Sequence, residues 1–368
     1  MCALTKRFRT LLGAVLGLMT AAIVSGAEDV RHFVVRHDPL EFSGWPANEG
    51  IWSWGDEILV GYNLGRYKAE EKGHSVEGKL RYGFSRSRDG GLTWTTEDHA
   101  DVLHYTAVKR DAIKPLEQPL PFAHPGLVFK SRQASFYSSV DRGQTWSGPW
   151  ALPSHPDAHV LARTSYLVTG EKSALLFLTT VSRPNTAKTE RGRSSVMETV
   201  DGGMSWQFLS FIGEDPGEGL PEDQLPAYSV MPAAVQLSAD HFVAAVRCRV
   251  NRRKWTEIHA SHDRGRSWTK LGTLERGSSN PAALVALGGD KIAAIYGWRG
   301  ERMGLRAKIS QDAGKTWGPE RILRDDALTW DIGYTRAVAR PDGALVIVYY
   351  YTTAERPQPH IEATLWKP

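Results

Sequence analysis

Several side chains that can move protons or bind anions stand at separated points of this chain. His74 lies in a polar loop, and a histidine titrates near neutral pH, so it can act as a general acid or base. Tyr334 stands just ahead of a strand-like stretch, and a tyrosine needs a neighbouring base or positive charge before it can act as a nucleophile. A carboxylate and four guanidinium groups complete the candidate set: Glu49, Arg163, Arg247, Arg299 and Arg302.

Most of these residues belong to a series of short segments that place polar or aromatic residues beside apolar, strand-like runs. The series comprises residues 48–52, 123–127, 162–166, 228–232, 279–283 and 333–336. If the runs are the innermost strands of sheets arranged around one axis, their starts converge on one pocket. Polar groups that meet in a central concavity are the default hypothesis for a binding site.

A second series, of five eight-residue segments, indicates the expected architecture. Each segment contains an Asp with a Gly one or two residues later and ends in Trp, and the segments are residues 87–94, 139–146, 199–206, 261–268 and 310–317. The aspartates are Asp89, Asp141, Asp201, Asp263 and Asp312, at intervals of 52, 60, 62 and 49 residues. Intervals of this size predict one supersecondary unit per repeat. The Asp can accept backbone N–H groups of a tight turn, and the Trp can bury its ring against the next repeat.

Strand signals surround each copy, for example residues 174–180 and 292–296. The tail adds residues 336–351, with a turn at 341–343, and residues 360–365. We expect residues 31–36 to supply a closing strand to the last sheet, because closure by both ends of the chain removes sheet edges. No Ser- or Pro-rich linker divides the chain, so residues 28–368 are predicted to form a single domain.

Residues 1–27 read as a secretory signal peptide. A basic start with three cations precedes an apolar run at residues 11–24 and the small residues 25–27. Without them the formal net charge of the 368-residue chain falls from +4 to +1, which gives no reason to expect a nucleic-acid partner. We expect an exported protein, periplasmic or extracellular, with no membrane attachment after cleavage. No Cys/His spacing or Gly-rich phosphate loop is present, so no cofactor and no metal are predicted.

The repeated octapeptides match the Asp box of the sialidase superfamily, and the chain resembles that family over nearly all of residues 28–368. The resemblance implies an all-β, six-bladed β-propeller of the sialidase type. It also implies that the five Asp-box aspartates are structural and lie at the rim away from the active site.

The same resemblance assigns roles to individual residues. Sialidases hold the substrate carboxylate with three arginines, of which the second matches Arg247 and the third Arg302, with Arg299 as a close competitor. Arg163 is a further candidate for substrate binding. The nucleophilic tyrosine matches Tyr334. A positive charge from Arg302 or Arg299 would lower the pKa of its hydroxyl.

Three positions depart from the sialidase pattern. Residues 46–50 contain no arginine where the first of the three is expected, Met231 stands where a carboxylate should activate the tyrosine, and no Asp precedes the first Asp box at residues 77–81. Glu49 and His74 fall in the first repeat, where the missing groups would have been, and complete the predicted catalytic set. Glu49 also has a simpler interpretation, as an ion-pair partner of an arginine in the 247–253 stretch.

The predicted function is therefore that of an exo-α-sialidase-like glycoside hydrolase with an atypical catalytic set, acting on a glycan with an acidic sugar. Two alternatives stay open. A uronate polysaccharide lyase needs a similar set of Tyr, His and Arg, and a non-catalytic glycan-binding propeller would explain the missing carboxylates. The sequence does not give the sugar, the linkage or the oligomeric state.

Overall fold

The computed structural model describes residues 30–70, 73–99, 112–152, 158–182, 191–221, 224–278 and 280–368. The predicted signal peptide, residues 1–27, and Ser279 of one predicted segment lie outside these ranges. Within the described residues, no helix is both long enough and apolar enough to span a membrane.

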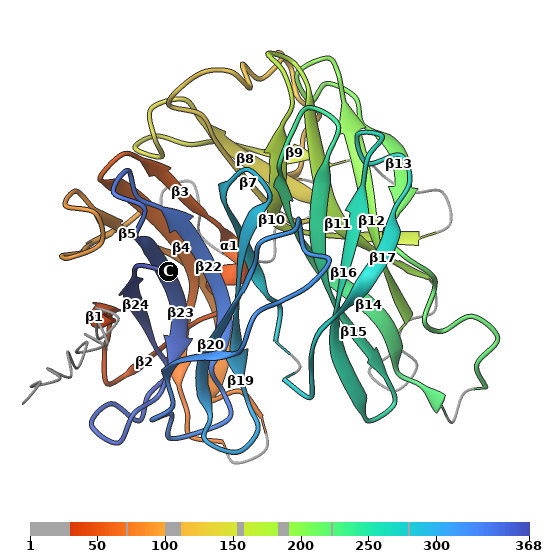
Figure 1. The fold of residues 1–368 in the computed structure, drawn as a ribbon. Helices are drawn as coiled ribbons and strands as arrows, with labels where there is room; N and C mark the ends of the chain where they lie inside the picture. The colour runs from red at the N-terminus through yellow and green to blue at the C-terminus, as the bar shows by residue number, and fades with distance from the viewer. Residues whose placement is uncertain are drawn as a thin grey trace, which may run out of the picture.

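The fold is all-β, as predicted, and its strands follow one another in antiparallel meanders (Figure 1). The first meander contains β2 (Glu41–Gly44), β3 (Ile51–Trp54), β4 (Glu57–Tyr67), β5 (Val76–Ser87) and β6 (Thr95–Glu97), with the short helix α1 (Pro46–Glu49) before β3. The second contains β7 (Val128–Gln133), β8 (Ser135–Ser139) and β9 (Ser147–Ala151). The third contains β10 (Ala158–Val168), β11 (Ala174–Ser182), β12 (Arg191–Thr199) and β13 (Gln207–Phe211).

The second half of the chain repeats this arrangement. One meander contains β14 (Ala227–Gln236), β15 (Phe242–Val250), β16 (Arg253–Ser261) and β17 (Thr269–Arg276). The next contains β18 (Ala283–Gly288), β19 (Lys291–Trp298), β20 (Gly304–Ser310) and β21 (Arg321–Arg324). The last contains β22 (Gly333–Ala339), β23 (Leu345–Tyr351) and β24 (His360–Trp366).

The N-terminal strand β1 (Arg31–Arg36) pairs antiparallel with β24, the last strand of the chain, so that Phe33 lies opposite Ala363. The predicted closing strand is thus confirmed, with the bounds expected from the sequence. Figure 1 shows the first and last meanders side by side, with α1 between them and the others. Backbone pairing also joins neighbouring meanders, since β7 pairs with β10 and β12 runs parallel to the start of β14.

The core lies between neighbouring meanders rather than on one side of a sheet. All seven residues of β23 are buried, because both faces of this strand are covered. One face packs against Phe42, Ile58 and Tyr62 of the first meander. A strand covered on both faces reads as a continuous apolar run, which explains the uninterrupted Leu-Val-Ile-Val-Tyr-Tyr-Tyr sequence of β23.

The repeated octapeptides form the tight turns that their residues predict. Asp89 Oδ1 accepts the backbone N–H of Thr93 at 2.9 Å, while Gly91 N–H donates to Ser87 Oγ at 2.8 Å. Burial raises the pKa of Asp89, but these hydrogen bonds lower it by more, to about 2, so the carboxylate stays ionised. The other four copies make the equivalent bonds, from Thr145, Ser205, Ser267 and Thr316 to Asp141, Asp201, Asp263 and Asp312.

Candidate functional site

The inner strands are irregular at the positions that the sequence predicts to line a site. The pairing register shifts between Gly333 and Arg336 in β22 and between Val230 and Ala233 in β14. Tyr334 and Met231, at these bulges, both have positive φ, 52° and 56°. A bulge re-aims a side chain, and non-glycine residues with positive φ persist where the surrounding structure holds them. The bulges lie within the strand in β10, β14 and β22, so the predicted segments 162–166, 228–232 and 333–336 do not precede their strands.

Gly333 and Asn280 fix the backbone that carries Tyr334. A Cβ on Gly333, whose φ is 101°, would lie 2.5 Å from Asn280 Oδ1, so only glycine fits there. The same oxygen accepts the backbone N–H of Tyr334 at 3.2 Å. Asn280, from the segment before β18, therefore locks the start of β22.

The Tyr334 hydroxyl lies among guanidinium groups. It accepts a hydrogen bond from Arg247 Nη1 at 3.3 Å, and Arg299 Cζ lies 5.9 Å from the centre of its ring. Burial raises the pKa of Tyr334, but the positive charges of Arg247, Arg299 and Arg163 lower it by more, so its pKa is below the ordinary value of 10.0. The three arginines thus stabilise the phenolate form of Tyr334, and Arg247 Nη1 also lies 3.8 Å from the sulfur of Met231.

A second tyrosine stands next to Tyr334 with the opposite behaviour. The ring centroids of Tyr334 and Tyr350 are 6.0 Å apart. Burial and the carboxylate of Asp331 raise the pKa of Tyr350 well above 10.0, and its hydroxyl donates to Asp331 Oδ1 at 2.6 Å. Two neighbouring groups whose pKa values are pushed apart are the arrangement expected of a site with one basic and one protonated partner.

Asp331 joins His74 to this group. His74 Nδ1 lies 2.6 Å from the same Asp331 oxygen, and the carboxyl is almost fully buried while the imidazole is 38% exposed. The imidazole also packs against Trp45 and Trp330, with ring centroids at 4.8 and 5.5 Å. A buried carboxylate behind an accessible imidazole fixes the tautomer, leaving Nε2 available for proton transfer.

Arg299 and Arg302, the two candidates for the third substrate-binding arginine, lie in different surroundings. Arg299 donates to the carbonyl of Ile332 at 2.8 Å and to the hydroxyl of Tyr350 at 3.0 Å, inside the Tyr334 group. The Arg302 side chain is 67% exposed and pairs with Asp325. Arg299, not Arg302, is therefore the arginine that acts on the pKa of Tyr334.

Arg163 is the third guanidinium whose charge acts on Tyr334. It lines a small cavity in which β10, β11, β14 and β22 meet. Within the described ranges its side chain makes no hydrogen bond or ion pair. Burial, and then the charge of Arg132, lower its pKa to about 10. Arg163 is half-buried, its buried Nε has no hydrogen-bond partner among the described residues, and an anionic ligand would supply one.

Glu49 contacts cations of β7 and, within the described ranges, makes no hydrogen bond or ion pair with Tyr334 or His74. It is completely buried, pairs with Lys130 Nζ at 2.5 Å and Arg132 Nη1 at 3.4 Å, and accepts a hydrogen bond from Asn63 at 2.8 Å. Burial raises the pKa of Glu49, but Lys130 and Arg132 lower it by more. Glu49 therefore forms an ion pair, as its simpler interpretation predicted, but its partners Lys130 and Arg132 belong to β7 and not to the 247–253 stretch.

Two members of the site, Asp331 and Tyr350, were not singled out from the sequence. Asp331 stands three residues before Tyr334, and that proximity is the signal that would have found it. Tyr350 is one of three consecutive tyrosines in an apolar strand, and nothing in the sequence distinguishes it from Tyr349 and Tyr351. The described residues contain no cluster of three or more His, Cys, Asp or Glu side chains arranged to hold a metal ion.

Comparisons with known proteins agree with this architecture. The sequence-family model of the BNR repeat-like domain matches residues 126–347, more than half of the chain. A search of curated proteins found no match. The structure is similar to a protein of unknown function from Dyadobacter fermentans, with a TM-score of 0.68 and 17% identity over 92% of this chain and 99% of that one.

Two further similar structures are glycoside hydrolases. One is an α-L-arabinofuranosidase from Fusarium graminearum, with a TM-score of 0.54 and 14% identity over 91% of this chain and 97% of that one. The other is the NanB sialidase from Streptococcus pneumoniae, with a TM-score of 0.53 and 10% identity over 88% of this chain and 69% of that one. At these identities the likeness establishes a sialidase-like propeller fold.

Proposed function

This chain belongs to the BNR repeat-like domain family, and we propose that it is an exported glycoside hydrolase of the sialidase type acting on a glycan with an acidic sugar. The observation that carries the proposal is the Tyr334 hydroxyl, held at 3.3 Å by Arg247 with its pKa lowered by three guanidinium groups. We further propose that residues 28–368 form one six-bladed propeller, supported by the successive meanders and the pairing of β1 with β24.

The positive charge of the site favours an acidic sugar over a neutral one. Arg163 has no partner among the described residues, and the positive charges of Arg163, Arg247 and Arg299 all act on Tyr334. A planar guanidinium offers paired donors to the two oxygens of a carboxylate. In the proposed complex Arg163 and Arg247 hold the sugar carboxylate beside Tyr334.

The proposed reaction uses Tyr334 as nucleophile and His74 as acid and base. The phenolate oxygen bonds to the anomeric carbon as the glycosidic C–O bond breaks, and His74 Nε2 gives its proton to the departing oxygen. Water then attacks the same carbon, His74 takes a proton from that water, and the Tyr334 oxygen leaves. Asp331 positions His74 and does not itself touch the substrate.

A uronate lyase is the second candidate, and the same observation favours it. A phenolate stabilised by arginines, with no carboxylate beside it, is a base as well as a nucleophile. With the sugar carboxylate neutralised by Arg163, the adjacent C–H becomes more acidic, Tyr334 removes that proton, and His74 protonates the leaving oxygen. This route yields an unsaturated sugar, whereas hydrolysis yields a saturated one.

The test is a substrate panel with matched tyrosine variants. Fluorogenic sialosides, an α-L-arabinofuranoside and uronate-containing polysaccharides are assayed with the parent chain, Tyr334→Phe and Tyr351→Phe. Tyr351 is the control because it follows Tyr350 in β23 and its own hydroxyl donates to Asp326 rather than to the Tyr334 group. Sugar release lost only in Tyr334→Phe supports the hydrolase, and an absorbing unsaturated product with the same dependence supports the lyase.

Other outcomes would reject the proposal. Release of arabinose that persists in Tyr334→Phe would contradict both the acidic substrate and the tyrosine mechanism. If no substrate is turned over while an acidic glycan binds and Arg163→Gln abolishes that binding, the protein is a glycan-binding propeller.

A further inference from the structure

The end of β15 and the start of β16 carry more positive charge than the proposed reaction uses. Arg247 contacts Tyr334, but Arg249 and Lys254, which stand on either side of the turn between the two strands, have no role in that reaction. Both side chains are half-buried, and neither forms an ion pair with a carboxylate of the described residues. Half-buried charges without a counter-ion indicate a binding site for an anion.

The strand register places both cations on the face of the sheet that carries the Tyr334 site. Residues two apart in a strand point to the same face, so Arg249 shares the face of Arg247. Lys254 lies directly opposite Arg249 in β16, and Tyr228 lies directly opposite it in β14. The Tyr228 hydroxyl accepts a hydrogen bond from Arg247 Nη2 at 3.3 Å. These side chains therefore form one continuous surface that begins at the Tyr334 hydroxyl.

Arg249 and Lys254 oppose each other electrostatically. Like charges directly opposite in neighbouring strands destabilise a sheet. Arg249 Nε donates to the carbonyl of Asn251 at 2.6 Å, which holds the guanidinium in place but brings no negative charge. Burial, and then the charges of Arg249, Arg247 and Arg299, lower the pKa of Lys254. An anion bound between the two side chains would offset this repulsion and accept hydrogen bonds from both.

The described carboxylate that shares this face is used by other partners. Glu275 lies opposite Thr256 in β17, and Thr256 lies opposite Arg247 in β15. Glu275 is buried, and it accepts from Thr256 Oγ1 at 2.7 Å and from the backbone N–H of Ser278 at 2.9 Å. Both partners are neutral, and burial raises the pKa of Glu275. It therefore does not neutralise Arg249 or Lys254.

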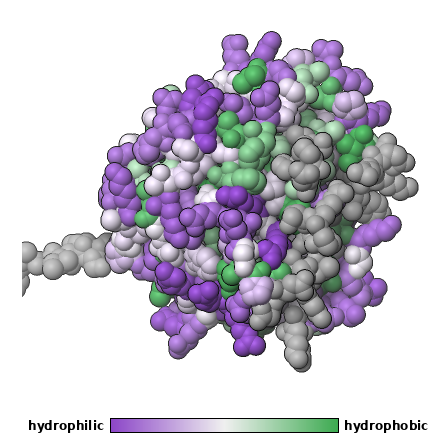
Figure 2. Space-filling model, turned by 90° about the vertical axis from the view of Figure 1, so that its right-hand side faces the viewer, coloured by the Kyte–Doolittle hydropathy of each residue, from purple (hydrophilic) through white to green (hydrophobic). Residues whose placement is uncertain are grey.

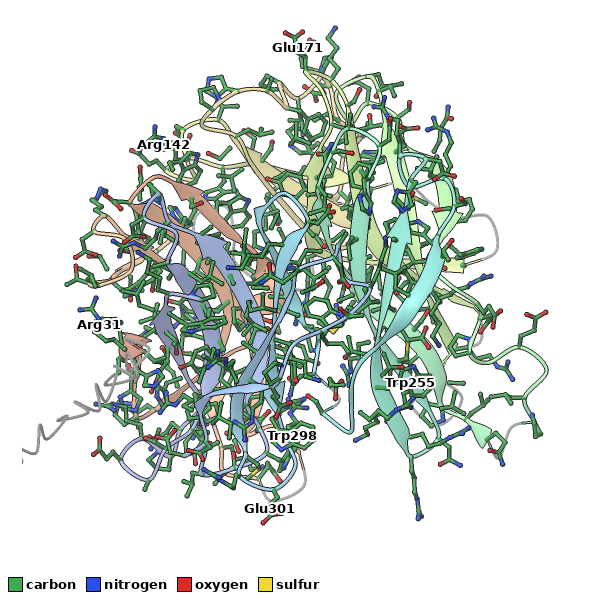
Figure 3. The ribbon with its side chains drawn as sticks, in the orientation of Figure 1. Arg31, Arg142, Glu171, Trp255, Trp298 and Glu301 are labelled. Atoms are coloured by element: carbon green, nitrogen blue, oxygen red, sulfur yellow. The ribbon has the colours of Figure 1, made fainter. Side chains whose placement is uncertain are left out.

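The two cations and the Tyr334 site belong to the same end of the molecule. Figure 3 shows Trp255 and Trp298 in its lower half and Glu171 at its upper end. Trp255 follows Lys254 in the chain, and Trp298 precedes Arg299, which contacts the Tyr334 group. In the side view of Figure 2 hydrophilic groups project from the lower edge of the molecule. A charged glycan can therefore approach both groups from one side.

From these contacts we propose that Arg249 and Lys254 bind the anionic group of the sugar unit next to the one held at Tyr334. The inference rests on the proposed function and narrows its substrate class to oligosaccharides with anionic groups on two successive units. Residues two apart in a strand lie roughly 6–7 Å apart, about the size of one sugar unit, so Arg247 and Arg249 can hold successive anionic groups. The second group is a carboxylate or a sulfate, since both offer several acceptor oxygens to the two cations.

The test compares substrates that differ in the charge of the second unit. Three sialosides carry galactose, 6-sulfated galactose or a second sialic acid there, and digalacturonate is paired with its methyl ester at the reducing-end unit. KM is measured with the parent chain, and Kd is measured by calorimetry with Tyr334→Phe. We expect a charged second unit to lower both constants about tenfold, with little change in kcat. The sialoside that gains more, sulfated or doubly sialylated, identifies the second anionic group.

Three variants locate this second subsite. Arg249→Gln and Lys254→Gln are each expected to reduce the tenfold preference to about threefold or less. Arg253→Gln is the matched control, because it removes the same charge from the exposed neighbour of Lys254, which points to the opposite face of β16, and it should keep the preference. Melting temperatures are expected not to fall in Arg249→Gln or Lys254→Gln, since each removes one member of a repelling pair.

The outcomes separate this inference from the proposed function. Charged and uncharged second units that give equal constants in the parent would overturn the inference while the turnover of both leaves the hydrolase or lyase intact. A preference that survives both Arg249→Gln and Lys254→Gln would also refute it. If the parent turns over none of these substrates and Tyr334→Phe binds none of them, the proposed function fails and the inference fails with it.

Discussion

The strongest test of the site is the ionisation of Tyr334 after loss of one arginine. Arg247→Gln removes the positive charge whose Nη1 lies 3.3 Å from the Tyr334 hydroxyl. At that distance and an effective dielectric constant of about 20, Coulomb's law gives roughly 5 kcal/mol, an upper bound because the charge is spread over the guanidinium. Measured effects of a neighbouring opposite charge are about 1–3 pKa units, so we expect the pKa of Tyr334 to rise by that amount.

The assay is a spectrophotometric titration of tyrosinate, with the curve of Tyr334→Phe subtracted to isolate one residue among twelve tyrosines. Arg302→Gln is the matched control, because this arginine is largely exposed and lies on Asp325. If activity depends on the phenolate, the acid limb of its pH profile shifts upward by the same amount in Arg247→Gln. A folded Arg247→Gln protein whose Tyr334 titrates as in the parent would refute the electrostatic argument.

Three other substitutions test the surroundings of the site and the fold. Asp331→Asn, which removes the charge behind the imidazole, is expected to lower kcat about 10²-fold or more with little change in KM, as measured by steady-state kinetics. Glu49→Gln leaves Lys130 buried without its anion and should lower the free energy of unfolding in urea by about 3–5 kcal/mol, whereas the double variant with Lys130→Met recovers part of the loss. Glu257 has its pKa raised by burial and lowered by more, to about 2, by its hydrogen bonds, so its stabilisation is present above the ordinary value of 4.5 and is lost as the pH falls toward 2. In Glu257→Gln this acid-dependent loss, up to about 3 kcal/mol, should be absent from the urea-unfolding curves.

The architecture was predictable because its determinants are local in sequence. Each Asp-Gly turn is built by hydrogen bonds within eight residues, so five copies indicate repeated units directly. The closing strand was predictable for a related reason, since an unpaired last sheet leaves an edge that residues 31–36 can cover. The exact start of the inner strands was not predictable, because the bulges in β10 and β14 depend on packing against neighbouring meanders.

The site was only partly predictable, because charge partners come from distant parts of the chain. Tyr334 could be singled out by its place at the start of a strand-like stretch, now β22, but the choice between Arg299 and Arg302 depends on which side chain turns inward. Arg302 has φ 53°, and its guanidinium lies on Asp325, 23 residues further along the chain. The partner of Glu49 is more remote still, since Lys130 is 81 residues away. No spacing rule connects such positions.

The replacement of the expected carboxylate by Met231 changes how the tyrosine can be activated. A carboxylate beside a tyrosine works by accepting its proton, and at the same time its charge opposes the phenolate. Here Arg247 donates to the Tyr334 hydroxyl and also contacts the thioether of Met231, so in the proposed mechanism activation works through charge stabilisation. The proton acceptor is then solvent or the substrate's own groups, and the accessible imidazole of His74 is left free for the departing oxygen. In the proposed mechanism this division of roles, with arginines for the phenolate and a buried Asp331 for the imidazole, leaves Tyr334 without a contact to any carboxylate of the described residues, which suits an acidic sugar.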